Sequence, residues 1–232
     1  MIIDEILNKA KEEMRTVLTE IEAKQILREA GINCTDTRLA DTKEAAVALS
    51  EQMGYPVVLK ISSVDITHKS DAGGVKLNLA DREGVEKAYD DVMASCRAKY
   101  PDAVIEGVAV QGMAKTGTEV IIGMTKDPSF GPVLMFGLGG IFVEVLKDVA
   151  FRIVPLDEGD AEEMIVEVKG SKLLQGYRGQ DQADIPFLAQ MLLNLSALVD
   201  KTEDILEIDM NPVFAYAQGA VVVDARIILE AV

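Results

Sequence analysis

The chain has 232 residues, of which 49% are hydrophobic, enough for the core of one sizeable domain or of two small lobes. Its 39 acidic and 23 basic residues give a net charge of −16, which argues against a nucleic-acid-binding protein, because phosphate backbones require clustered Lys and Arg. No apolar run is long enough to span a membrane, no signal peptide is visible, and two distant Cys with one His exclude a zinc site. We therefore expect a cytoplasmic protein with reduced thiols and no membrane partner.

Capping boxes, helical spacing of apolar residues and Gly or Pro stops define the elements in the first half of the chain. Thr19 and Glu22 form one capping box, and Asp41 and Glu44 form another. In chain order, the pattern predicts helix 3–14, helix 19–31, helix 41–54, strand 55–62, strand 75–79, helix 81–99 and strand 107–113.

Strands that follow one another directly dominate the second half. In chain order, the pattern predicts strand 118–127, strand 132–137, helix 157–169, helix 184–199, strand 205–216 and strand 220–229. Because hairpin-adjacent strands outnumber alternating strands and helices, we predict an α+β fold rather than a doubly wound parallel sheet.

The last two strands carry polar residues that could bind a metal ion. Asp209 and Asn211 alternate and therefore share one face of a strand. A two-residue turn at 218–219 would pair Val213 with Asp224 and place Asp224 one diagonal step from Asn211, roughly 7 Å away. Oxygen ligands at this spacing are typical of Mg²⁺, which completes its shell with phosphates and water. A solvent-facing polar side of a hairpin would show the same pattern.

The single histidine, His68, lies in a polar loop beside Lys69, Ser70 and Asp71 and shortly before two glycines. Such a loop can direct backbone N–H groups at an anion. On the loop sequence alone, an exposed histidine without a chemical task is the simpler interpretation. If the protein uses histidine chemistry, His68 must perform it, because there is no other histidine.

Three further segments carry weaker signals. The glycine cluster at 137–140 allows a ligand to approach the backbone closely, but a plain tight turn explains it equally well. Lys60, at the end of an apolar strand, is either a structural lysine or a phosphate ligand. The segment 111–113 could be a hinge strand, and Arg178 could face a partner or an anion.

Taken together, these segments resemble the β subunit of ADP-forming acetate–CoA ligase, an ATP-grasp protein, over about residues 19–229. The most specific stretches are HKSDAGGV and FGPVLMFGLGGIFVE, followed by EIDMNPVFAY and VVVDARI. The resemblance implies an ATP-grasp fold with two α+β lobes and the nucleotide between them. It divides the chain into an N-terminal helix at 1–18, an N-terminal lobe with the His68 loop at 19–108, and a C-terminal lobe with the hinge and the Mg²⁺ site at 109–232.

The resemblance also implies a role for each candidate residue. It assigns phosphate contacts to Lys60, the adenine hinge to Gln111, Gly112 and Met113, the ribose contact to Glu119, and further nucleotide contacts to Gly139 and Gly140. It assigns the Mg²⁺ ion to Asn211 and Asp224, and transient phosphorylation to His68. Either Asp65 or Asp71 could orient the imidazole ring.

The implied reaction is acyl-CoA + ADP + phosphate ⇌ carboxylate + CoA + ATP. His68 would carry a phosphoryl group between a phosphohistidine of a separate α subunit and ADP, in an α2β2 assembly. The more distantly similar succinyl–CoA synthetase β chains continue into a further domain, and we expect this chain to leave the CoA chemistry to its partner. A stand-alone ATP-grasp carboxylate ligase and a non-catalytic nucleotide-sensing module stay open as alternatives.

Overall fold

The computed structural model describes residues 2–140, 147–176 and 181–231. The chain forms two compact units: residues 1–34 together with 115–232 form unit 1, and residues 35–114 form unit 2. This division differs from the predicted lobes at 19–108 and 109–232. Helix α2 (Glu20–Glu29) packs against strand β10 (Ala225–Leu229) of unit 1, so the segment after residue 18 does not belong with the His68 loop.

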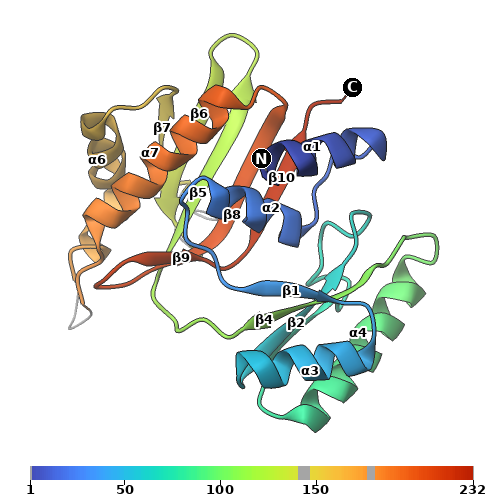
Figure 1. Ribbon diagram of the computed structural model, residues 1–232. Helices are drawn as coiled ribbons and strands as arrows, with labels where there is room; N and C mark the ends of the chain where they lie inside the picture. Colours follow the sequence, from blue (N-terminus) through green and yellow to red (C-terminus); the bar gives the residue numbers. More distant parts are fainter. Residues whose placement is uncertain (1, 141–146, 177–180, 232) are drawn as a thin grey trace. The chain divides into compact units, whose positions relative to one another are not determined.

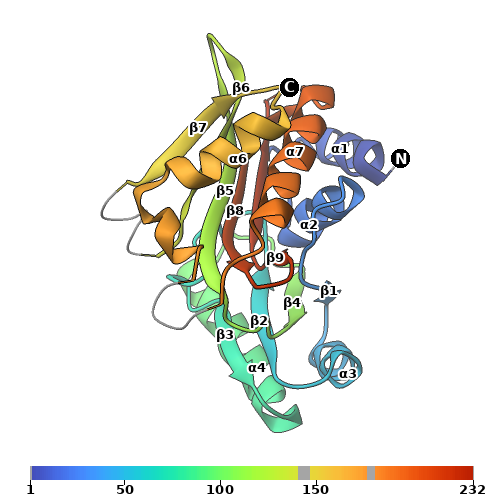
Figure 2. The same ribbon diagram turned by 90° about the vertical axis from the view of Figure 1, so that its left-hand side faces the viewer.

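Unit 1 is built on a six-stranded antiparallel sheet with the order β10-β8-β5-β6-β7, in which β9 pairs with the end of β8. Helices α1, α2 and α7 cover one face of this sheet (Figures 1 and 2). Its further elements are α1 (Ile2–Glu12), β5 (Thr118–Asp127), β6 (Gly131–Leu138), β7 (Val149–Ile153), α6 (Glu158–Glu167), the 3₁₀ helix η1 (Lys169–Leu173), α7 (Ile185–Lys201), β8 (Ile205–Ala215) and β9 (Ala220–Val222).

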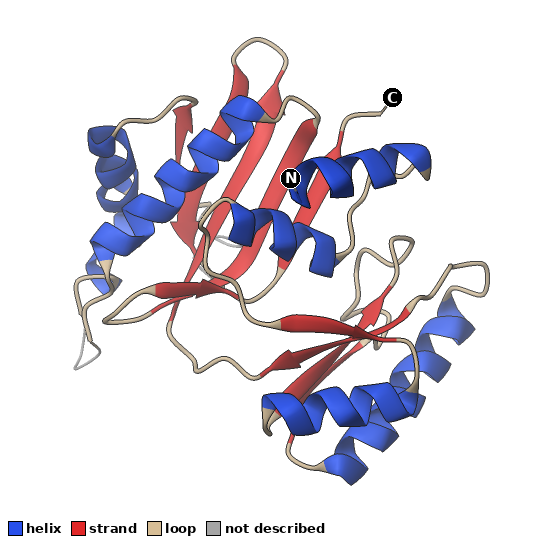
Figure 3. Cartoon of the chain, viewed as in Figure 1, coloured by secondary structure: helices blue, strands red, loops and turns tan. Residues whose placement is uncertain are grey.

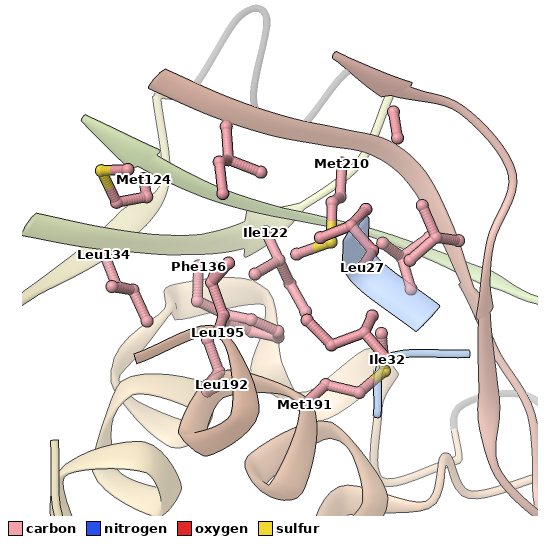
Figure 4. Close-up of a cluster of buried hydrophobic side chains, with 14 of the residues drawn as sticks. Leu27, Ile32, Ile122, Met124, Leu134, Phe136, Met191, Leu192, Leu195 and Met210 are labelled. Carbon is pink, nitrogen blue, oxygen red and sulfur yellow. The ribbon is translucent and has the colours of Figure 1, made fainter. Parts of the chain in front are cut away.

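The core of unit 1 forms between the sheet and these helices. Ile122 and Phe136 point from the sheet toward Leu192 and Leu195 of α7, and Met210 lies near them (Figure 4). All five side chains are fully buried. The strands therefore present alternate residues to the core, and the residues between them, such as those flanking Met210 on β8, remain available on the other face.

Unit 2 is a four-stranded antiparallel sheet with the order β1-β4-β2-β3 and two helices, shown in red and blue in Figure 3. Val57, Leu59 and Ile61 of β2 belong to a separate apolar core with residues of α3 and α4. Its elements are β1 (Thr37–Ala40), α3 (Lys43–Met53), β2 (Val57–Ser62), β3 (Val75–Leu79), α4 (Arg82–Lys99) and β4 (Gly107–Gly112).

The structure confirms the predicted α+β class and corrects several local predictions. The opening helix ends at Glu12, and Met14 is 91% exposed with a left-handed backbone (φ 53°). The third helix is capped by Thr42 rather than Asp41, because the Thr42 side chain accepts the Ala45 N–H. Strands β1 and β7, of four and five residues, were not predicted. Among the described residues, no helix is both long and apolar enough to cross a bilayer.

Candidate functional site

A polar corner of unit 1 brings Asn211 and Asp224 directly opposite each other. Met210 pairs with Ala225, and the Asn211 N–H donates to the Asp224 carbonyl oxygen at 3.2 Å. Val213 pairs with Val222, so the predicted pairing of Val213 with Asp224 is wrong. Residues directly opposite have Cβ atoms roughly 5 Å apart, closer than the predicted diagonal.

The register differs because the hairpin turn lies one residue earlier than predicted. Tyr216 N–H donates to the Gly219 carbonyl oxygen at 3.0 Å, so the two turn residues are 217 and 218. Gly219 follows the turn and has a positive φ of 76°. Moving the turn by one residue shifts every cross-strand pair by two, which exchanges the diagonal Asn211–Asp224 pair for a direct one.

The side chains around this corner are predominantly acidic. Burial raises the pKa of Asp209; the Arg226 guanidinium lowers it, and the carboxylates of Glu207 and Asp224 raise it again. Arg226 also donates to the Glu207 carboxylate. The carboxylates of Glu207, Asp209 and Asp224 thus outnumber the single guanidinium of Arg226 at this corner, which favours the approach of a cation.

The donor chemistry fits Mg²⁺ bound together with a nucleotide. Carboxylate and amide oxygens are hard ligands, and Mg²⁺ in nucleotide sites commonly takes one or two protein ligands and completes its shell with phosphate and water. Within the described part of the chain, no group of three or more His, Cys, Asp or Glu side chains could hold an ion. An ion held by Asn211 and Asp224 would therefore need oxygen ligands from the nucleotide.

The raised pKa of Asp209 predicts a pH-dependent effect on stability. The pKa of Asp209 is higher in the folded than in the unfolded protein, so the protonated carboxyl favours the folded state. Its contribution to the free energy of unfolding is fully present below the unfolded pKa and is lost as pH rises through the folded pKa. We expect Asp209→Asn to raise the free energy of unfolding at pH 7 in metal-free buffer, with no gain below about pH 4. Urea unfolding at both pH values measures this, with exposed Asp102→Asn as the control. An equal gain at both pH values would contradict the prediction.

A second feature of unit 1 is the close approach of the glycine cluster to Glu119 of β5. The Gly139 N–H donates to the Glu119 carbonyl oxygen at 2.8 Å, and a Cβ atom at Gly139 would lie 2.8 Å from the Glu119 Cβ. Gly140 has a φ of 62°, which a side chain rarely adopts. Both positions therefore need glycine: Gly139 because the backbone passes close to the exposed Glu119, and Gly140 because of its positive φ. Their contact with a nucleotide stays a prediction.

In unit 2, Lys60 and Gln111 lie on one face of the sheet. Val58 pairs with Gln111 and Lys60 with Ala109, so the two polar side chains are diagonal neighbours on the face opposite the apolar core. Both are buried, and the Gln111 amide oxygen accepts from the Thr37 hydroxyl at 3.4 Å. Two long polar side chains on a buried sheet face are unusual for a plain core. Their contact with a phosphate or a base stays a prediction.

The proposed hinge residues follow directly at the end of the same strand. Gly112 pairs with Val57, and a Cβ atom there would meet nothing within 4 Å. The Met113 N–H donates to the Pro56 carbonyl oxygen at 3.1 Å, while the Met113 side chain is 37% exposed. The backbone is therefore fixed, and an apolar side chain remains accessible for a flat base.

His68 is exposed at the start of a compact turn in unit 2. Its carbonyl oxygen accepts the Ala72 N–H at 3.1 Å, and the Lys69 carbonyl oxygen accepts the Gly74 N–H at 2.8 Å. Gly74 is required here, because a Cβ atom would lie 2.6 Å from the Ile61 Cγ2 atom. The glycines thus hold a packed turn that presents the imidazole to solvent.

Neither aspartate of the loop orients the His68 ring in this structure. The Asp65 carboxylate accepts the Val104 N–H at 2.8 Å, and the Asp71 carbonyl oxygen accepts from Lys99. In the described ranges, the His68 side chain forms no hydrogen bond or ion pair, so its ring is exposed without a fixed partner. Arg178 lies outside the described residues.

One residue beside the polar corner was not predicted. Lys24 of α2 is fully buried, and its Nζ atom donates to the Val223 carbonyl oxygen at 2.7 Å. The preceding turn of α2 carries Glu20, and the neighbouring helical positions Ala23 and Leu27 are fully buried. The sequence did contain a signal for this residue, because Glu20 and Lys24 form an (i, i+4) charged pair on the apolar side of a helix.

Comparisons with known proteins identify similar chains. A family model described as an ATP-grasp domain matches residues 9–229. The β subunit of acetate–CoA ligase [ADP-forming] II from Pyrococcus furiosus is 49% identical over 232 residues, covering 99% of this chain and 97% of that protein.

Solved structures of an acetyl-coenzyme A synthetase 1 from Ca. Korarchaeum cryptofilum are also similar. A complex with coenzyme A, Ca-AMPCP and HgCl⁺ superposes with a TM-score of 0.96 at 50% identity, covering 97% of this chain and 99% of that one. A second complex, with coenzyme A and Mg-AMPPCP, has its phosphohistidine segment pointing towards the nucleotide-binding site; its TM-score is 0.87 at 47% identity, covering 98% of this chain and 100% of that one.

Proposed function

Because the chain belongs to the ATP-grasp family, we propose that it is the nucleotide-binding β subunit of an ADP-forming acyl-CoA synthetase. The observation that carries the proposal is the similarity to such a subunit over nearly the full length of both chains. The polar corner at Asn211 and Asp224 and the exposed His68 supply the two chemical features that this activity needs. The overall reaction is acyl-CoA + ADP + phosphate ⇌ carboxylate + CoA + ATP.

In this proposal His68 is a phosphoryl carrier. An imidazole nitrogen attacks the phosphorus of a phosphohistidine on the partner, so one N–P bond forms as the other breaks. A terminal phosphate oxygen of ADP then attacks the phosphorus on His68, which gives ATP and returns the free imidazole. Imidazole is suited to both steps, since it is a good nucleophile and a good leaving group near neutral pH.

The remaining candidate residues bind the nucleotide. Lys60 contacts the phosphates, the backbone of 111–113 contacts the adenine, and Glu119 contacts the ribose. Gly139 and Gly140, which lie close to Glu119, supply further nucleotide contacts. When bound at Asn211 and Asp224, Mg²⁺ would supply positive charge that offsets the negative charge of the phosphate oxygens.

The acyl-CoA chemistry belongs to a partner α subunit, in an α2β2 assembly. Only one histidine is present, so this chain provides only one of the two phosphohistidines that the relay requires. Both cysteines are free and buried, and burial raises the pKa of the Cys34 thiol to about 11. Unreactive thiols agree with a reducing compartment, and we propose the cytoplasm as the location.

Reconstitution with the α subunit tests the proposal. We expect the two subunits to co-purify and to release CoA from an acyl-CoA only when ADP, phosphate and Mg²⁺ are all present. We also expect an acid-labile phosphoprotein after rapid quenching. Turnover of ATP and a carboxylate by this chain alone would instead indicate a stand-alone ligase. Nucleotide binding without any phosphoprotein would indicate a sensing module.

A further inference from the structure

A buried ion pair of α2 lies beside the proposed cation site. The Lys24 side chain is 0% exposed and the Glu20 side chain 3% exposed, with 2.7 Å between Lys24 Nζ and Glu20 Oε1. Burying two charges is costly, and apolar replacements of such pairs often leave stability unchanged or increase it. The stability of unit 1 therefore explains this pair poorly, and the contact of Lys24 with β10's approach segment becomes informative.

That contact reaches the residue immediately before Asp224. Lys24 Nζ donates to the Val223 carbonyl oxygen at 2.7 Å. Val223 and Asp224 form the gap between β9 and β10, where regular pairing is interrupted. The Val223 carbonyl and the Asp224 N–H belong to one planar peptide unit, so a bond to this oxygen fixes the orientation in which the chain enters Asp224.

Strand β8 holds the same gap from the other side. The Val223 N–H donates to the Pro212 carbonyl oxygen at 2.9 Å, and the Asp224 carbonyl oxygen accepts the Asn211 N–H. The backbone of the gap is thus fixed between β8 on one side and the Lys24 ammonium on the other. Without Lys24, the Val223 oxygen would lose a charge-assisted hydrogen bond, and the peptide unit before Asp224 could rotate.

The segment that follows α2 is attached to β9, which helps to give Lys24 a defined position. The Val222 N–H donates to the Asn33 carbonyl oxygen at 2.9 Å, and the Asn33 side-chain amide donates to the Ala220 carbonyl oxygen at 2.9 Å. At the other end, the Thr19–Glu22 capping box fixes the start of the helix. The start of α2 and the segment after it are therefore both anchored, and α2 packs against β10 between them (Figure 1).

We propose that Lys24 is a positioning residue for the cation site: its hydrogen bond to Val223, with its charge balanced by Glu20, holds Asp224 opposite Asn211. This inference rests on the proposed function, because the cation it concerns is the Mg²⁺ of the nucleotide complex. Residues that orient metal ligands typically change metal affinity by roughly 10–100-fold when they are replaced. Lys24 therefore contributes to the affinity for Mg·ADP without touching the nucleotide.

The double variant Glu20→Leu/Lys24→Met tests the proposal, because it removes both buried charges together and should fold. Calorimetric titrations with ADP are made once with Mg²⁺ and once with EDTA, beside thermal denaturation. We expect Mg·ADP affinity to fall at least about tenfold. Metal-free ADP should bind within about twofold of wild type, and the Tm should be unchanged or higher.

Two control variants separate positioning from folding. Glu20→Gln keeps the lysine donor but leaves its charge unbalanced, so we expect it to lower the Tm and to reduce Mg·ADP affinity less than the double variant does. Arg15→Met removes a different ion pair made by a residue of α2, in which Arg15 Nη2 lies 2.9 Å from Glu22 Oε1. We expect this variant to have a lower Tm and unchanged Mg·ADP affinity.

Three results would overturn the proposal. The first is a folded double variant with wild-type Mg·ADP affinity, and the second is an equal loss of affinity for ADP with and without Mg²⁺. The third is failure of the double variant to fold, which would assign the pair to stability. A wild-type chain that does not distinguish Mg·ADP from ADP would instead contradict the proposed function itself, and the inference with it.

Discussion

His68→Ala is expected to abolish ATP formation by the reconstituted complex, with a loss of at least about a thousandfold, as for other covalent nucleophiles. The ring has no hydrogen bond or ion pair within the described residues, and it is exposed. Removing it should therefore change the free energy of unfolding by only about 0.5 kcal/mol or less. The affinity for Mg·ADP should stay within about twofold, because the carrier residue does not form the nucleotide site.

Rapid-quench measurements with radioactive phosphate distinguish the carrier role from a general loss of activity. In the His68→Ala complex, the partner subunit should still form acyl phosphate and its own phosphohistidine, while the label on this chain disappears. Ser70→Ala is the matched control, since Ser70 is exposed in the same turn and its carbonyl accepts the Gly73 N–H. Wild-type turnover by the His68→Ala complex would refute the carrier role.

Asp224→Ala should weaken Mg·ADP binding by at least about tenfold, in the range seen when a metal site loses an oriented group. Asp224 is the only charged member of the directly opposed pair with Asn211. The backbone bond between the two residues does not involve the Asp224 side chain, so the hairpin should persist. Calorimetry with Mg²⁺ and with EDTA should show the loss only when the metal is present.

The control for this variant is Asp204→Ala, which removes an exposed carboxylate of unit 1 that pairs with Lys11 at 2.8 Å. It changes the net charge by the same amount as Asp224→Ala and should leave Mg·ADP affinity unchanged. If both variants weakened binding equally, a general electrostatic effect would explain the result. Unchanged affinity in Asp224→Ala would remove Asp224 from the set of ligands.

Local signals were sufficient for most of the helices and strands but not for the register of the last hairpin. The Thr19–Glu22 capping box and the stop at Gly31 lie where the sequence predicts them, because both depend on neighbouring residues only. In the hairpin, Gln218-Gly219 is typical of a two-residue turn, yet Gly219 provides a positive φ just after it. A glycine inside a two-residue turn and a glycine just after such a turn give the same sequence pattern. The register of the last hairpin could therefore not be predicted from the sequence.

The parts of the site that could not be predicted depend on contacts between distant segments. Nothing within α2 indicates that it packs on β10, so the segment after residue 18 was placed in the wrong unit. For the same reason, the contact of Lys24 with Val223 could not be predicted, since 199 positions separate the two residues. The proximity of Asn211 and Asp224, though not their direct pairing, was predictable because both residues lie in one hairpin.

The discontinuity of unit 1 determines the order in which the two units can fold during translation. Unit 2 is complete once residue 114 has left the ribosome, whereas the first strand of the unit 1 sheet begins only at Thr118. Helices α1 and α2 are therefore synthesised first and must wait for the sheet that covers them. Leu7 and Ile26, both buried in the finished protein, remain uncovered until then. The nascent chain thus passes through an interval with exposed apolar surface, the condition that promotes aggregation in incompletely folded chains.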